Sequence, residues 1–294
     1  VALMPDVTPS KFRSQANGII NFMGGVGAII SFLGGAALYE LNIAFPFWLG
    51  SGLVILAALL VFVFIKEPKV VGEDKPESKP GMVESLRVIM ADAERSALRI
   101  LLAIFFWFVA YNAIEAFFTL YAVNHLGTSE ADGARLLGQL ALLFVIFSLP
   151  SGYIGARIGR RLTIILGIVI MAAMMLTMYI VPAATLTILI TRLPVLGDVP
   201  IVGLALMLAG IAWALININS LPMVVDMTED ARIGTYTGLY YLFSTLAAIA
   251  GPNINGIIVQ IAGRNYQMVM AIGPVFMLLA LIMMLGVRRG EAKA

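Results

Sequence analysis

The sequence predicts an all-α polytopic membrane protein, a helical bundle in which about eight spanning helices are present. The composition is the first observation: of 294 residues, 61% are hydrophobic and 12% are charged, and the mean hydropathy is +0.97. A soluble domain carries about 25% charged residues, so the composition excludes a soluble enzyme, a disordered chain and a collagen-like chain. The second observation is that the apolar residues form long continuous blocks, and the third is a one-sided distribution of Lys and Arg.

Eight blocks contain the roughly 20 apolar residues that a helix needs to cross the hydrocarbon core. They predict spans over residues 15–38, 45–66, 100–122, 136–156, 161–181, 200–222, 236–260 and 266–287. The apolar runs are continuous, whereas strands of a membrane barrel are shorter and alternate in polarity, so the sequence favours helices.

Lys and Arg orient these spans. Threading the chain through eight spans places 16 of the 19 basic residues on one side and leaves Arg135, Arg192 and Arg264 on the other. Because cytoplasmic loops are rich in Lys and Arg, both ends of the chain are expected in the cytoplasm, with the helices in the inner cell membrane. The net charge of +2 does not indicate nucleic-acid binding, and a chain without cysteine and with one histidine predicts no metal site.

The longest polar segment divides the chain into three parts. Residues 1–66 hold two spans, and residues 100–294 hold six. Residues 67–99 read as a flexible cytoplasmic linker of mixed charge that ends in an amphipathic helix.

Two similar segments precede the first and the seventh spans. Residues 4–18 read MPDVTPSKFRSQANG and residues 224–238 read VVDMTEDARIGTYTG. Asp6 matches Asp226 at a constant offset, and Arg13 matches Arg232 with a slip of one residue. A repeat at the start of a span is typical of a duplicated transporter. If each copy precedes the fifth span of a six-span half, the whole protein has twelve spans and this chain is a fragment that lacks the first four. We expect Asp226 and Arg232 to pair at a cytoplasmic gate, with Asp6 and Arg13 in the other copy.

The loop GYIGARIGRR, residues 152–161, resembles the G-x-x-x-D-R-x-G-R-R signature of the major facilitator superfamily. The matching residues are Gly152, Arg157, Gly159, Arg160 and Arg161. Ala156 stands in place of the usual acidic residue, which weakens the expected conformational latch. The segments around both repeats are similar to bacterial relatives of the sucrose/proton symporters, and the glycoside–pentoside–hexuronide symporters are a neighbouring possibility. The resemblance implies a major facilitator bundle, with the matched residues at the cytoplasmic gate.

Polar side chains inside the spans mark a candidate cavity, because polar groups in hydrocarbon are costly unless they face water or another helix. The candidates for substrate binding or proton coupling are Tyr111, Asn112, Glu115, Thr119, Trp213, Asn217, Asn219, Tyr240 and Tyr241. The second, fifth and eighth spans are almost wholly apolar, which predicts a position facing lipid. For Asn17, Asn21, Asn253 and Asn255, both cavity lining and helix bridging remain open.

Glu115 is the only acidic residue well inside an apolar span. A carboxylate there must be paired, hydrated or protonated, so we expect it to exchange a proton or bind a substrate hydroxyl. The alternative is a structural hydrogen bond to Tyr111, Asn217 or Asn219. Aromatic rings beside amide and carboxylate groups suit a sugar.

The sequence therefore predicts a secondary active carrier of a sugar or glycoside, working by alternating access as a monomer in the lipid bilayer. A proton gradient is the expected driving force, Na⁺ is the alternative ion, and no cofactor is expected. An exporter of amphipathic drugs or a carrier of another small metabolite is the alternative function. An enzyme is not expected, since HExxH, GxSxG and paired intramembrane aspartates do not occur.

Overall fold

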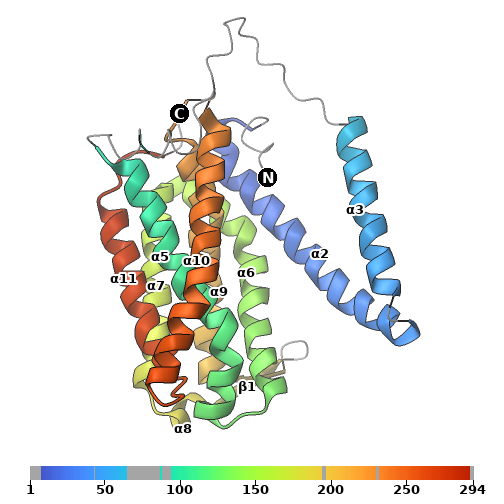
Figure 1. Ribbon diagram of the computed structural model, residues 1–294, viewed down its shortest axis with the longest axis vertical. Helices are drawn as coiled ribbons and strands as arrows, with labels where there is room; N and C mark the ends of the chain where they lie inside the picture. The colour runs from blue at the N-terminus through green and yellow to red at the C-terminus, as the bar shows by residue number, and fades with distance from the viewer. Residues whose placement is uncertain are drawn as a thin grey trace, which may run out of the picture.

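The computed structural model describes residues 8–42, 44–64, 87, 94–193, 197–229 and 232–291, and most of these residues are helical (Figure 1). In chain order the elements are η1 (Ser10–Phe12), α2 (Arg13–Leu41), α3 (Phe45–Phe64), α5 (Ser96–Tyr121), η2 (Ala122–Leu126), α6 (Glu130–Ile158), α7 (Arg160–Ile180), α8 (Ala183–Leu186), β1 (Leu189–Leu193), β2 (Gly197–Pro200), α9 (Ile201–Val225), α10 (Ile233–Ile261) and α11 (Met268–Leu285). The predicted all-α membrane bundle is confirmed.

Six long helices form the main bundle. Helix α9 packs between α6 and α7, and α5 packs against α10 and α11 (Figure 1). Buried side chains occupy 67% of the most apolar window of α9, the largest share among the spanning helices described. A helix that is apolar on all sides is stable only where protein or lipid surrounds it, so α9 forms the centre of this bundle.

Helices α2 and α3 lie beside the bundle. The first half of α2 packs against α6 and α9, and the helix then leans away from α6 towards the opposite end (Figure 1). Helix α3 contacts α2, and none of the residues in its apolar window from Phe47 to Phe64 is buried by the described chain. Bare apolar surface of this kind suits contact with lipid.

Seven helices among the described residues are long and apolar enough to cross a membrane. They are Phe47–Phe64, Ser96–Leu126, Asp132–Ile158, Arg160–Ile180, Ile201–Val225, Ile233–Ile261 and Met268–Leu285. Each coincides with a predicted span, and α2 covers the remaining one, residues 15–38, as a continuous helix. Helix α5 begins at Ser96, inside the predicted linker. Asp6 and the linker, apart from residue 87 and residues 94–99, lie outside the described residues.

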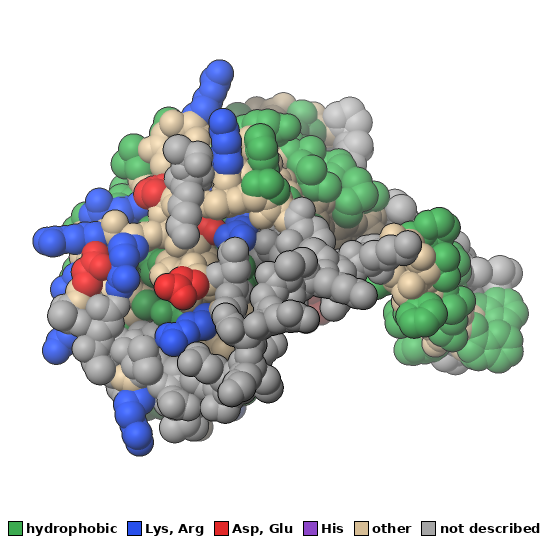
Figure 2. All heavy atoms as spheres, turned by 90° about the horizontal axis from the view of Figure 1, so that it is seen from above, with side chains coloured by type: hydrophobic (Ala, Val, Ile, Leu, Met, Phe, Trp, Pro, Cys, Tyr) green, Lys and Arg blue, Asp and Glu red, His purple; other side chains and the backbone are tan. Residues whose placement is uncertain are grey.

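The end of the bundle that carries both termini is rich in basic side chains, as the view onto that end shows (Figure 2). Exposed residues there include Arg157, Arg232, Arg288 and Arg289. We call it the arginine-rich end. These four described residues are among the basic residues that the sequence assigned to one side of the membrane.

A short antiparallel hairpin at the opposite end was not predicted. Strands β1 and β2 pair Arg192 with Asp198 and Leu193 with Gly197. The Arg192 guanidinium donates to the Asp198 carboxylate at 2.5 Å and holds the pKa of that carboxyl below its usual range. Gln139 of α6 donates to the Asp198 carbonyl at 2.9 Å, which fixes the hairpin against the bundle.

Glycines allow the helices to approach closely. A Cβ added at Gly167 of α7 would lie 2.7 Å from the Ala212 carbonyl oxygen of α9, and one added at Gly210 of α9 would collide with the Leu140 carbonyl of α6. Small residues at such contacts permit backbone-to-backbone packing, which stabilises helix pairs in membranes where hydrophobic burial cannot.

We expect Gly210→Ala to destabilise the bundle, because the new methyl group has no space between α9 and α6. The expected loss is about 1–3 kcal/mol, the usual cost of overpacking. Thermal unfolding in detergent measures it. Gly138→Ala is the matched control, since nothing lies within 4 Å of a Cβ added there. Equal unfolding temperatures for the two variants would contradict this account of the contact.

Candidate functional site

A cluster of aromatic rings joins the middle of α5 to the middle of α9. The Tyr111 ring stacks on Trp213 with centroids 3.7 Å apart and planes 4° apart. Phe108 meets Trp213 edge-on at 5.1 Å and 88°. Tyr111 and Trp213 are 9% and 3% exposed, so these rings are closely packed and shielded from water.

Glu115 lies one helical turn from Tyr111 and accepts a 2.9 Å hydrogen bond from its hydroxyl at Oε1. The Glu115 side chain is exposed on a face of α5 that none of the described helices covers. On the same helix, the Asn112 amide donates to the Phe108 carbonyl at 2.7 Å, and half-buried Thr119 packs beside Gly133 of α6. Glu115 is therefore the group on this face with capacity to bind a ligand or a proton.

Helix α10 extends the cluster with two tyrosines. The Tyr240 ring meets Phe108 edge-on at 6.4 Å, and its hydroxyl lies 3.1 Å from the Ser220 hydroxyl of α9. Tyr241 meets Tyr240 edge-on at 5.3 Å and is 41% exposed. The structure thus brings Tyr111, Trp213, Tyr240 and Tyr241, which come from three separate spans, into one cluster.

The two predicted asparagines of α9 have different surroundings. Asn219 is fully buried, and its amide donates to the carbonyls of Ser151 in α6, at 3.2 Å, and of Leu215, at 3.0 Å. Gly155 leaves the space that this side chain fills. Asn219 therefore bridges two helices, whereas Asn217 is half-buried.

A second group of interacting residues lies at the arginine-rich end, where Arg160 at the start of α7 contacts residues of α9 and of the segment around the start of α2. This buried guanidinium pairs with Asp226 at the end of α9 and donates to Ser14 Oγ of α2 at 2.8 Å. It also donates to the carbonyls of Ser10, at 2.6 Å, and Pro222, at 3.1 Å. The arrangement satisfies the donors of a cation that could not otherwise remain buried.

Asp226 receives a second cation from α2. Arg13 pairs with its Oδ1 atom, and the Ser10 hydroxyl donates to Oδ2 at 2.6 Å. Asp226 and Arg13 are 6% and 8% exposed. The carboxylate therefore links the two-helix part of the chain to the six-helix part, and we call Arg13, Arg160 and Asp226 the end lock.

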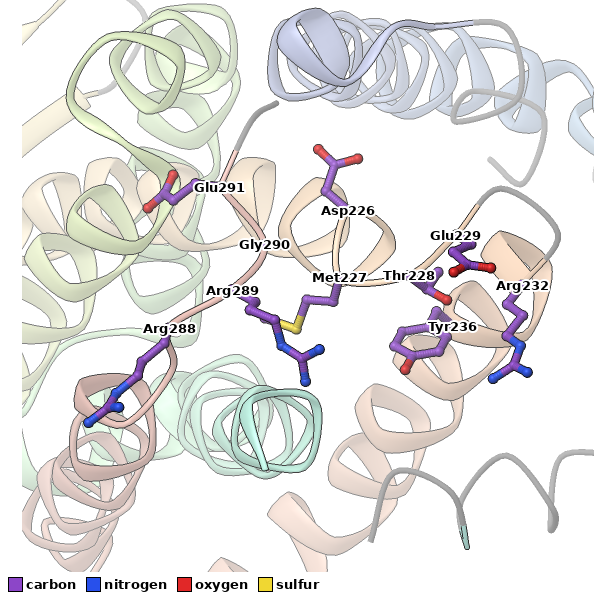
Figure 3. A pocket seen from close by; sticks show the side chains of 10 residues that line it. All are labelled: Asp226, Met227, Thr228, Glu229, Arg232, Tyr236, Arg288, Arg289, Gly290 and Glu291. Atoms are coloured by element: carbon purple, nitrogen blue, oxygen red, sulfur yellow. The ribbon is translucent and has the colours of Figure 1, made fainter. Parts of the chain in front are cut away.

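This pairing corrects the prediction for Arg232. The sequence paired Asp226 with Arg232, but in Figure 3 the Asp226 carboxylate points towards α2 and Arg232 lies on the far side of the pocket. The pocket, a cavity of about 600 Å³, is lined by residues 226–229, Arg232, Tyr236 and residues 288–291. Residues close in sequence need not pair when helix packing offers a nearer partner.

The turn between α6 and α7 positions Arg160. Gly159 has φ +94°, a conformation that disfavours other residues, and it offers no side chain to cap α7. Glu291, beyond α11, supplies the cap instead: its carboxylate accepts from the backbone N–H of Arg160 at 2.7 Å and of Arg161 at 3.0 Å. An anion at a helix N-terminus is favourable. The C-terminal segment therefore stabilises the first turn of α7, from which the Arg160 side chain of the end lock extends.

The remaining signature residues have distinct surroundings. A Cβ added at Gly152 would lie 2.6 Å from the Ser14 carbonyl oxygen, so this glycine lets α6 approach α2. Arg161 donates to the Leu285 carbonyl at 2.7 Å and thereby holds the end of α11, while Arg157 is exposed.

Sequence reasoning missed Ser10, Ser14, Phe108 and Glu291. Phe108 lies in an apolar run that is typical of any span, and Glu291 lies in a short polar segment without a recognisable motif. Within the described ranges, no group of three His, Cys, Asp or Glu residues could hold a metal ion.

Comparison with known families agrees with this architecture. The family model described as Major Facilitator Superfamily matches residues 1–197 and, in an overlapping match, residues 140–294. This chain belongs to the Major Facilitator Superfamily. It is thus a multi-pass membrane transporter, as the signature loop indicated. No curated protein matches the chain significantly.

Solved structures share this Major Facilitator Superfamily fold. The fucose:proton symporter FucP of E. coli aligns with a TM-score of 0.78 at 15% identity, over 98% of this chain and 72% of its own. A structure of FucP in the outward conformation aligns with a TM-score of 0.76 at 15% identity, over 98% and 71%. The proton:xylose symporter XylE aligns with a TM-score of 0.69 at 14% identity, over 100% and 68%.

We expect Asp226→Asn to open the arginine-rich end, because it leaves two buried guanidinium groups without a counter-charge. Breaking a buried pair costs about 3–5 kcal/mol. The measurement is the labelling rate of a cysteine placed at buried Ser148, with a membrane-impermeant maleimide added at the arginine-rich end. Asp198→Asn, which alters an exposed pair, is the control. An unchanged rate in Asp226→Asn would show that the end lock does not stabilise the closed arrangement of this end.

We expect Glu291→Ala to expose the first turn of α7, because the backbone N–H groups of Arg160 and Arg161 lose their acceptor. Loss of a helix cap costs about 0.5–2 kcal/mol. Hydrogen exchange of these two amides should accelerate in the variant. Glu229→Ala removes the same charge from the same pocket and should leave their exchange unchanged.

Proposed function

We propose that this transporter carries a sugar or glycoside together with a proton, by alternating access. The observation that carries the proposal is the Glu115 carboxylate beside the stacked rings of Tyr111 and Trp213, on a face of α5 that the described helices leave uncovered. Aromatic rings stack against the apolar faces of sugars, and a carboxylate binds hydroxyl groups or a proton. The fold shared with fucose:proton and xylose:proton symporters supports this class.

The arrangement of the helices supports alternating access. The end lock joins α2 to α7 and α9 at the arginine-rich end, and α2 leans away from α6 towards the other end (Figure 1). We assign the arginine-rich end to the cytoplasm, because loops rich in Lys and Arg remain on that side. With this orientation, we propose an arrangement closed inwards and open outwards, of a protein that works as a monomer in the inner cell membrane.

One observation favours a second candidate, an exporter of amphipathic compounds. The outer half of α9 exposes Leu204 and Leu208, which are 39% and 44% exposed. A wall of this kind suits an apolar ligand better than a hydroxylated one.

Uptake by the full-length protein in vesicles separates the two candidates. With an imposed proton gradient, a labelled mono- or disaccharide should accumulate, and a protonophore should abolish the accumulation. Accumulation driven by a Na⁺ gradient alone would show that Na⁺, and not the proton, is the coupling ion. Transport of amphipathic dyes without any sugar would favour the exporter.

We expect Glu115→Gln to abolish uphill accumulation, because the amide keeps the shape of the side chain but cannot bind and release a proton. Exchange of substrate without a gradient should survive if Glu115 couples the proton, and should fall as well if it binds the substrate. Glu130→Gln, at the exposed start of α6, is the control. Normal accumulation by Glu115→Gln at normal expression would remove Glu115 from the mechanism.

A further inference from the structure

A proline inside α9 creates a hydrogen-bond acceptor in the membrane. Pro222 has no N–H, so it cannot donate to the carbonyl of Ile218, four residues earlier, as an ordinary helical residue does. Ile218 is fully buried. A carbonyl without a donor in an apolar environment is costly, and in membrane helices it is satisfied by a neighbouring helix, a side chain or water.

The donor for this carbonyl comes from the other part of the chain. Asn17 of α2 is 4% exposed, and its Nδ2 donates to the Ile218 oxygen at 2.7 Å. Gly18 permits this approach, since a Cβ added there would lie 2.6 Å from the Ser148 carbonyl oxygen and 3.6 Å from Ile218. The bond joins α2 to α9 one helical turn from Arg13, on the side towards the middle of the membrane.

Three other asparagines in the spans bond within their own helices. Asn21, Asn112 and Asn253 donate to the carbonyl four residues earlier in their own helices. Such bonds persist when helices move relative to each other. The Asn17 bond persists only while α2 remains against α9.

We propose that Asn17 and the carbonyl freed by Pro222 form a second, uncharged latch of the arginine-rich end. The latch is made when this end is closed, and it breaks when α2 separates from α9. In the open arrangement, water in the opened cavity must replace the Asn17 amide at the Ile218 oxygen. The proposal rests on alternating access. In it, Pro222 leaves the Ile218 carbonyl oxygen free to accept the bond from Asn17, in addition to any kink that it causes in α9.

The test is a double-mutant cycle in the full-length protein with a reporter cysteine at Ser148, a fully buried position of α6 beside Gly18. A membrane-impermeant maleimide is added at the arginine-rich end, and the labelling rate is measured. Asn17→Ala should raise this rate about three- to tenfold, the effect of one hydrogen bond in a membrane protein. Asn253→Ala, whose bond lies within α10 and away from Asn17, should leave the rate unchanged.

The decisive comparison repeats the Asn17→Ala substitution in a protein that also carries Pro222→Ala. Its new N–H donates to the Ile218 oxygen within α9, so Asn17→Ala should then change the rate little. Pro252→Ala removes a proline from α10 instead, and in that background the effect of Asn17→Ala should keep its full size. An equal effect of Asn17→Ala in the presence and in the absence of the Pro222→Ala substitution would overturn the latch.

Two further measurements separate the possible failures. If substrate and a proton gradient do not alter labelling of the reporter in the otherwise unchanged protein, alternating access fails. If they alter it but Asn17→Ala labels at the unchanged rate, the latch alone is wrong. Should Asn17→Ala lower the unfolding temperature, Asn17→Leu keeps the branched shape of the side chain, has no donor, and must give the same increase.

Discussion

The buried guanidinium of Arg160 is the constraint around which one end of this transporter is organised. A cation without solvent must find a counter-charge and acceptors for its donors. Asp226 supplies the charge, and Ser10, Ser14 and Pro222 supply acceptors from α9 and from the start of α2. The Gly159 turn and the Glu291 cap hold the backbone from which this side chain extends. Because the acceptors come from both parts of the chain, the parts cannot separate here without exposing the charges to water.

Helix α9 connects this end to the candidate cavity. Trp213 lies at its middle in the aromatic cluster, and Asp226 caps its end in the lock. Pro222 lies between them, where the loss of one helical hydrogen bond offers a carbonyl to Asn17. A ligand that displaced the aromatic rings would therefore act on the same helix that carries both contacts to α2. In the proposed alternating-access mechanism, α9 is the element through which occupation of the cavity would act on closure of the end.

The candidate cavity combines two kinds of surface. Around the middle of α5, Glu115 and the aromatic rings offer one ionisable group among stacking surfaces. Towards its start, α9 exposes leucines. The first surface supports the proposed sugar and proton, and the second supports the proposed alternative, an apolar ligand. The shared fold with sugar:proton symporters concerns the scaffold, whereas the choice between ligands depends on these few side chains.

The sequence by itself determined the spanning helices, the clustering of basic residues at one end and the superfamily signature. These features are local: a run of apolar residues long enough to cross a bilayer becomes a helix whatever its neighbours are. It also indicated the importance of Asp226 and Arg13 through their repeat. Only the tertiary structure decided that Asp226 pairs with Arg13 and Arg160 and not with Arg232, and that Asn219 bridges helices. The β1–β2 hairpin and the Glu291 cap were equally beyond sequence reasoning. Such partners lie far apart along the chain, and the packing of the helices alone sets which of them meet.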